Sequence, residues 1–404
     1  MTTTRRNFLA AAGAIGAMAP FIKADDKTGS KNPIIGEGDH KYECIHDWGE
    51  LPSNIKYGNT HNVAEDAQGH IYVHHTVYED SPSPDSVVAF DEKGKFVRSF
   101  GAMFRGGAHG MHLAKEGKTE YLYFCDEKHG IITKRTLKGE EVWTMGYPQD
   151  SPIYQKGIGA KGPGGSAGLN YRPTNIAIAP NGDFWVGDGY GSYYMFHYSV
   201  ASATAYPKLV NVFGGPAPAA AAPARGGGAP GGGAPGGAPG PVAGGAPGGP
   251  APARGGGRGA RPPAPIDQMN NPHGNMVDLR DPAKPILLIA DRGNRRIVRY
   301  TLDDKPIDIV EGTQQPCHFH HYKEAIVVPD LGGPVYLFDK DNKVVATLGK
   351  PAAGTNPPRT TTDRSKFVPG QFVAPHGAIF DHNGNIFVAE WVEIGRVTKL
   401  RKVA

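Results

Sequence analysis

A strand-turn-strand pattern recurs six times along the 404 residues of the chain. Each copy begins with an apolar run, passes through turn residues such as Asn-Gly, and returns in a second apolar run, as in "PTNIAIAPNGDFWVGDGY" and "PHGAIFDHNGNIFVAEW". A third strand follows most copies, for example "RRIVRYTL", and strands ending in glycine, such as "VVATLG", separate them. Long helical periodicity is absent, so the pattern is typical of β-propeller blades and argues against an α/β enzyme.

The two ends of the chain predict how the propeller closes. The last copy stops at "RVTKLRKVA" after its third strand, whereas "YECIHDWGE" (42–50) supplies an outer-type strand before the first copy. We therefore predict an all-β, six-bladed propeller over residues 42–404, in which the N-terminal strand completes the C-terminal blade. Closure of this kind removes the free sheet edges of an open array.

Residues 214–265 consist almost entirely of Gly, Ala and Pro. Such a segment lacks the apolar side chains whose burial offsets the entropy of chain ordering. Blade patterns continue on both sides of it. It is therefore predicted to be a disordered insertion between blades three and four, and not a domain boundary.

Charge and cysteine content exclude two classes of protein. The formal net charge is +4, but seven basic residues without acidic neighbours lie in residues 1–24 and 214–265. The remainder is near neutral, which predicts no nucleic-acid partner. Three cysteines are too few for a disulfide framework, so we expect mostly buried or free thiols.

The N-terminus resembles a twin-arginine export signal. Arg5 and Arg6 precede a mildly apolar run that extends to Pro20, and a small residue near Ala24 suits cleavage, so the signal is assigned to residues 1–24. The run is too short and too rich in Ala and Gly to span a bilayer stably. An ordinary secretion signal or an uncleaved anchor is the alternative. The mature protein is expected to be soluble in the periplasm or beyond, without a stable membrane span.

Histidine recurs at the start of the first strand in several copies. His61, His112, His273 and His376 share this position. An offset of fourteen residues joins His61 to His75, His112 to Asp126 and His376 to Glu390, and a longer turn separates His273 from Asp291. The innermost strands of a propeller line its channel, so these imidazoles should converge. Converging imidazoles suit zinc or another borderline divalent ion. The alternative is that each histidine only plugs the channel mouth through hydrogen bonds.

These residues resemble the propeller of peptidyl-α-hydroxyglycine α-amidating lyase, within the wider NHL-repeat group. "GMHLA", "NNPHGNM" and "VAPHGAI" match its zinc histidines at His112, His273 and His376. "GDGYG" matches its catalytic tyrosine at Tyr190, and "ADRG" matches an arginine at Arg292. The resemblance covers nearly all of the propeller apart from the insertion. It implies an enzyme that splits a carbinolamide into an amide and glyoxylate.

The resemblance also implies roles for the site residues. Zinc would act as a Lewis acid on the substrate hydroxyl. Tyr190 would be a general base whose pKa zinc and Arg292 depress, and Arg292 would hold a carboxylate or polarise the leaving group. As structural alternatives, Tyr190 packs in a Gly-rich turn and Arg292 pairs with Asp291 or with a neighbouring blade.

Several positions depart from the lyase pattern. His75 stands where the lyase has an arginine in blade one, and Gly377 stands where it has an aspartate linked to calcium, so calcium is a weak second candidate cofactor. The departures imply altered carboxylate recognition and a changed metal environment. Further candidate channel residues are His61, His75, His318 and Asp291.

Three functions follow from the sequence. The first is a zinc-dependent, lyase-like enzyme that acts in the channel on a small hydroxylated molecule or an α-hydroxyglycine-like peptide end. The second is a non-catalytic NHL-repeat propeller that binds a protein or a glycan, with structural histidines. A redox or quinone-linked propeller dehydrogenase is the third, and no specific residue supports it.

Overall fold

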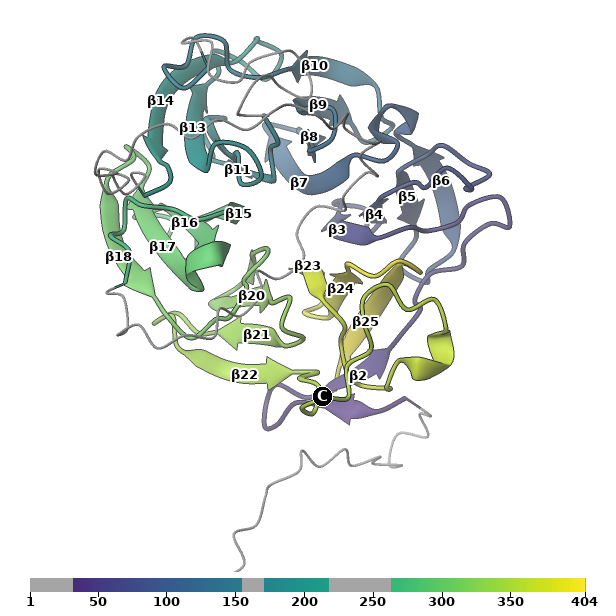
Figure 1. Cartoon of the computed structure of the whole chain (residues 1–404). Coiled ribbons are helices and arrows are strands. Elements are labelled where there is room, and N and C mark those ends of the chain that lie inside the picture. Colours follow the sequence, from purple (N-terminus) through teal and green to yellow (C-terminus); the bar gives the residue numbers. More distant parts are fainter. Residues whose placement is uncertain (1–31, 155–170, 218–262, 404) are drawn as a thin grey trace, which may run out of the picture.

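The computed structural model describes residues 32–154, 171–217 and 263–403, which form a six-bladed β-propeller (Figure 1). The predicted fold class is confirmed. The described helical segments are single 3₁₀ turns, and none of them is long and apolar enough to cross a membrane. The predicted export signal and most of the predicted insertion lie outside the described residues.

The blades follow one another in chain order, each with its first strand innermost. Blade one contains β3 (Thr60–Glu65), β4 (Ile71–His75), β5 (Val87–Phe90) and β6 (Phe96–Phe100); blade two contains β7 (Ala108–Glu116), β8 (Thr119–Asp126), β9 (Ile131–Thr136) and β10 (Glu141–Met145); blade three contains β11 (Asn175–Ile178), β12 (Phe184–Gly187), β13 (Tyr194–Ser199) and β14 (Lys208–Gly214). Blade four contains β15 (Pro272–Asp278), β16 (Ile286–Asp291), β17 (Arg296–Thr301) and β18 (Pro306–Val310); blade five contains β19 (His320–Tyr322), β20 (Ala325–Pro329), β21 (Val335–Phe338) and β22 (Val344–Leu348); blade six contains β23 (Pro375–Phe380), β24 (Ile386–Glu390) and β25 (Arg396–Lys402), with β2 (Tyr42–Ile45) and β1 (Ile34–Ile35). The 3₁₀ turns are η2 (Ala102–Phe104), η3 (Arg292–Asn294) and η4 (Arg364–Lys366).

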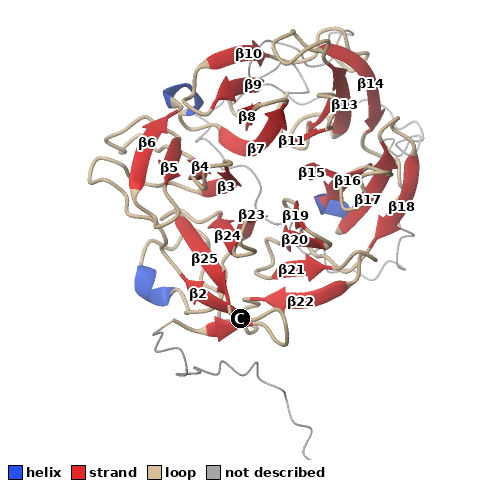
Figure 2. Cartoon of the chain, turned by 180° about the vertical axis from the view of Figure 1, so that it is seen from behind, coloured by secondary structure: helices blue, strands red, loops and turns tan. Residues whose placement is uncertain are grey.

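Blade six joins the two ends of the chain, as predicted. β2 pairs antiparallel with β25, in a register that places Tyr42 opposite Lys402, and β1 adds an edge strand. Figure 1 shows the purple N-terminal strand beside the yellow C-terminal strand. In Figure 2, seen from behind, the first strands of all six blades surround the central axis.

The apolar core lies between neighbouring blades. One cluster combines Phe90 of blade one with Phe387 of blade six, and another combines Tyr123 of blade two with Phe184 of blade three. Because apolar burial is completed between the sheets, the channel end of the inner strands is free to carry polar residues. The three cysteines are buried and free, which confirms the expectation for them.

A β-bulge opens the inner strand of four blades. In blade six, the pairing register shifts between Pro375 and Gly377, so an extra residue lies between them. A bulge of this kind turns a side chain out of the regular alternation of the strand. The residues inside the four bulges include one histidine each: His61, His109, His273 and His376.

Glycine follows the histidine in blades two, four and six. A Cβ on Gly377 would lie 2.5 Å from the carbonyl oxygen of His61, and a Cβ on Gly274 would lie 2.4 Å from that of Cys317. A Cβ on Gly110 would likewise lie 2.5 Å from the carbonyl oxygen of Thr174 in blade three. Only glycine therefore allows each inner strand to approach the backbone of the next blade this closely.

The Gly377→Ala variant should lose about 1–3 kcal/mol of unfolding free energy, because the added methyl group overlaps backbone atoms of blade one. Urea unfolding measures the change. Gly146→Ala is the matched control, since a Cβ there meets nothing within 4 Å. Equal stability of the two variants would contradict the close approach.

Candidate metal centre in the channel

Four buried histidines of the inner strands converge at one end of the channel. The ring centroids of His109, His273 and His376 lie 4.7–5.0 Å from one another. The ring of His61 lies 5.3 Å from that of His109 and 5.1 Å from that of His376. One histidine each from blades one, two, four and six thus forms the cluster, with His109 in blade two where the prediction had His112.

The three histidines that precede glycine are held in the same way. Each Nδ1 lies within hydrogen-bond distance of a carbonyl oxygen of the next blade: His109 to Thr174 (2.6 Å), His273 to Cys317 (2.8 Å) and His376 to His61 (2.9 Å). Since a carbonyl only accepts, Nδ1 carries the proton and Nε2 carries a lone pair. This outer contact is the one that orients histidine ligands of metals.

Tyr190 and Arg292 lie beside the cluster. The Tyr190 hydroxyl is 3.2 Å from Nε2 of His109 and 3.1 Å from Nε2 of His273, and Arg292 donates to it at 3.1 Å. Arg292 also donates to the side-chain oxygen of Asn271 at 2.8 Å. The two predicted catalytic residues are therefore brought together with two histidines, and Arg292 pairs with Tyr190 and Asn271, not with Asp291.

A tight turn brings Tyr190 to blade four. Tyr190 follows β12, and a Cβ on the preceding Gly189 would lie 2.1 Å from the carbonyl oxygen of Pro272. The Asn271 side chain donates to the carbonyl oxygen of Gly189 at 2.5 Å. Asn271 has a φ of 60°, an uncommon conformation for a residue with a side chain. It bridges the Tyr190 turn and Arg292.

The donor atoms fit a cation. Nε2 of His109 and Nε2 of His273 both contact the Tyr190 hydroxyl, which has a single hydrogen to donate. One of these two nitrogens therefore keeps a lone pair that no hydrogen bond from Tyr190 satisfies. Donor atoms of His61, His109 and His376 lie within 4.8 Å of one another, and those of His273, Cys317 and His376 do as well. Nitrogen-rich groups with a nearby sulfur suit a borderline divalent ion. Calcium, which takes oxygen ligands, fits them poorly.

The predicted ligand His112 lies outside the cluster, and His109 takes the corresponding place in it. Ala108 pairs with Asp126 in blade two, so the β7–β8 hairpin is three residues longer than the equivalent hairpin of blade six, where Pro375 pairs with Glu390. The fourteen-residue spacing therefore selected His112, which pairs with Tyr123 further along β7. The triplet Ala-His-Gly, which parallels Pro-His-Gly in blades four and six, was the signal for His109.

Of the further candidates in blade one, His61 belongs to the cluster and His75 does not. Nε2 of His61 lies 2.8 Å from the Thr76 hydroxyl, while its buried Nδ1 has no hydrogen-bond partner among the described residues. His75 ends β4, where its Nδ1 contacts the carbonyl oxygen of Thr76 at 3.1 Å and its ring packs on Tyr57.

His318 and Asp291 also lie apart from the two groups that could hold a metal. Nδ1 of His318 contacts the carbonyl oxygen of Ala378 at 3.1 Å. Asp291 accepts a hydrogen bond from the backbone N–H of Asn270 at 2.8 Å and pairs with Arg296 at 2.7 Å. Asp291 therefore holds the loop that enters β15, which is a structural role.

Burial sets the protonation of the site. Desolvation, the largest cause, lowers the pKa of His109, His273 and His376 well below its usual value, and the charge of Arg292 lowers it further. The imidazoles are therefore neutral at physiological pH, as metal ligands must be. Burial also raises the pKa of Tyr190, while Arg292 lowers it. Among the protein groups alone, desolvation outweighs the guanidinium, so the net shift of the Tyr190 pKa is upward.

No family model and no curated protein matches the chain. Among solved structures, it is similar to a streptogramin B lyase, with 11% identity, a TM-score of 0.49, and coverage of 90% of this chain and 99% of that chain. It is also similar to a gluconolactonase from Xanthomonas campestris, with 12% identity, a TM-score of 0.49, and coverage of 90% of this chain and 90% of that chain. For a virginiamycin B lyase from Staphylococcus aureus, the identity is 11%, the TM-score is 0.44, and the coverage is 89% of this chain and 100% of that chain. Values this low carry no argument about activity.

Proposed function

We propose that the chain is a metal-dependent, lyase-like enzyme that acts in the propeller channel on a small hydroxylated substrate or an α-hydroxyglycine-like peptide end. The observation that carries this proposal is the Tyr190 hydroxyl, placed between Nε2 of His109, Nε2 of His273 and the Arg292 guanidinium. A tyrosine held among a cation and neutral imidazoles is suited to move a proton at the channel end of the fold.

His376 belongs to both groups that could hold a metal, and we propose that it binds zinc together with His109 of one group and His273 of the other. When bound, the metal supplies Lewis-acid stabilisation of the charge that develops on the substrate hydroxyl. Three histidines leave a position open for the substrate, as catalytic zinc sites require. The repeated contact between Nδ1 and a carbonyl oxygen supports this choice of ligands, because it fixes each ring and reserves Nε2 for the metal.

The chain's own residues supply the proton transfers. Tyr190 accepts the proton of the substrate hydroxyl, the carbon–nitrogen bond breaks as the new carbonyl forms, and the departing amide nitrogen takes that proton back from Tyr190. Arg292 stabilises the Tyr190 phenolate, which exists before the first transfer and again after the second. Asn271 holds Arg292 in place through its side-chain oxygen. The products are an amide and an aldehyde, and no redox partner is needed.

The proposal is tested with N-benzoyl-α-hydroxyglycine, a small carbinolamide. The purified protein should release glyoxylate from it, chelation should abolish the release, and added zinc should restore it. A wild-type protein that is metal-free, and that zinc neither binds nor stabilises, would favour the non-catalytic binding propeller instead.

Export by the twin-arginine route is also proposed, on the basis of Arg5 and Arg6. Changing both to lysine should leave the precursor in the cytoplasm, because the recognition pair is lost. Cell fractionation followed by immunoblotting measures the distribution. Normal accumulation of the double variant outside the cytoplasm would refute this route.

A further inference from the structure

The crossover from blade five to blade six, residues 349–374, carries a guanidinium group near the histidine cluster. The Cζ atom of Arg359 lies 3.7 Å from the ring centroid of Trp391, and the Trp391 ring lies 6.4 Å from the ring of His376. Trp391 directly follows the end of β24. Burial is the main cause of the lowered pKa of His61, and the charge of Arg359 adds to it. Arg359 therefore lies at the same end of the channel as the metal-binding groups.

Arg359 differs from the other arginines near this end. Arg292 is committed to Tyr190 and Asn271, and Arg172 pairs with Glu127. No carboxylate in the described part of the chain lies within ion-pair distance of Arg359. Its planar face rests on Trp391, which leaves the N–H groups along its edge for another partner.

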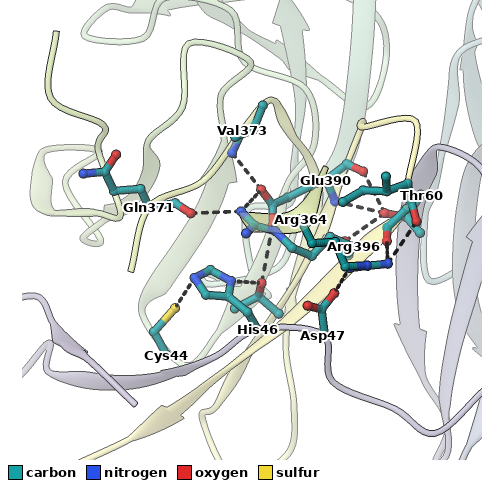
Figure 3. A network of polar contacts seen from close by, with 12 residues as sticks. Cys44, His46, Asp47, Thr60, Arg364, Gln371, Val373, Glu390 and Arg396 are labelled. Atoms are coloured by element: carbon teal, nitrogen blue, oxygen red, sulfur yellow. Dashed lines mark hydrogen bonds and ion pairs between the residues drawn. The ribbon is translucent and has the colours of Figure 1, made fainter. Parts of the chain in front are cut away.

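The crossover is fixed to blade six. The carbonyl oxygen of Arg359 accepts a hydrogen bond from the backbone N–H of Glu393 at 3.0 Å. Figure 3 shows Arg396 donating to the carbonyl oxygen of Gln371 at 3.0 Å and forming a buried ion pair with Glu390. The contact with Glu393 positions the backbone of Arg359 before any ligand binds, which lowers the ordering cost of binding, and the contact of Arg396 holds the later part of the crossover.

We infer that Arg359 and Trp391 form a carboxylate-binding subsite, in which the guanidinium edge pairs with a carboxylate and the tryptophan ring packs against the adjoining carbon atoms. A planar guanidinium matches the two oxygens of a carboxylate, and an indole face suits an apolar neighbour. This inference rests on the proposed function for the position of the reacting hydroxyl. It narrows the substrate class to hydroxylated molecules that carry a carboxylate close to the bond that breaks.

The test uses two inert probes that lack the reacting hydroxyl: N-benzoylglycine, which has a carboxylate, and N-benzoylglycinamide, which does not. Calorimetric titration of the wild-type protein should show tighter binding of N-benzoylglycine. Arg359→Met should lose that preference, with affinity for N-benzoylglycine falling by about tenfold or more, because a charge-assisted hydrogen bond is lost. Arg359→Lys should retain part of it.

Arg105→Met is the matched control. Arg105 is an exposed arginine that donates to the carbonyl oxygens of Tyr78 and Glu79, and its loss should leave the preference unchanged. A wild-type protein that does not prefer N-benzoylglycine, or an Arg359→Met variant that binds it as tightly as wild type, would overturn the inference. Failure of the proposed function is distinguishable: the carboxylate preference would remain while no glyoxylate is released from N-benzoyl-α-hydroxyglycine.

Discussion

Replacing His109, His273 or His376 by alanine is expected to lower bound zinc from about one ion per chain to well below that value. Each ring supplies one donor to a site that needs all of its well-oriented ligands. Each variant should still fold, because the apolar core lies between the blades. Elemental analysis after mild dialysis measures the metal, and thermal unfolding verifies the fold.

His112→Ala is the matched control for this series. His112 lies on the same strand as His109 but outside the cluster, where burial lowers its pKa to about 4. This variant should keep its metal. Loss of zinc from His112→Ala together with retention in His109→Ala would contradict the bulge register of blade two.

Tyr190→Phe is expected to keep its metal and to lose lyase activity by about 10²–10⁴-fold, because the hydroxyl that moves the proton is removed while the imidazoles stay in place. Release of glyoxylate from N-benzoyl-α-hydroxyglycine measures the activity, and elemental analysis measures the metal. Tyr336→Phe, on β21 of blade five, is the control and should be unaffected. Activity in Tyr190→Phe close to that of the wild type would exclude Tyr190 as the base.

The blade count and the closure could be predicted because they depend on local patterns. Alternating apolar residues and turn residues mark each strand pair. The segment "YECIHDWGE" (42–50) has the pattern of an outer strand but precedes the first blade and belongs to no strand pair of its own. Tyr190 and Arg292 could be predicted through the resemblance, because "GDGYG" and "ADRG" lie at the ends of the second strands of blades three and four.

The ligand of blade two could not be placed from spacing. A longer β7–β8 hairpin and a bulge at His109 displace the register, and neither changes the apolar pattern of the strands. The sequence makes Asp291 a channel candidate because this residue ends the second strand of blade four, beyond a longer turn than in the other blades, although its contacts hold a loop. Arg359 lies in a crossover without periodic pattern, and only the folded chain brings it against Trp391.

The central claim is that one metal is bound by three histidines from three blades. Anomalous diffraction at the zinc edge, from crystals of the protein purified without added metal, tests it most directly. The account predicts one peak in the channel at about 2.0–2.1 Å from Nε2 of His109, His273 and His376, beside the Tyr190 hydroxyl. A channel without a peak even after zinc is added, or a peak held by another set such as His61 and Cys317, would contradict it.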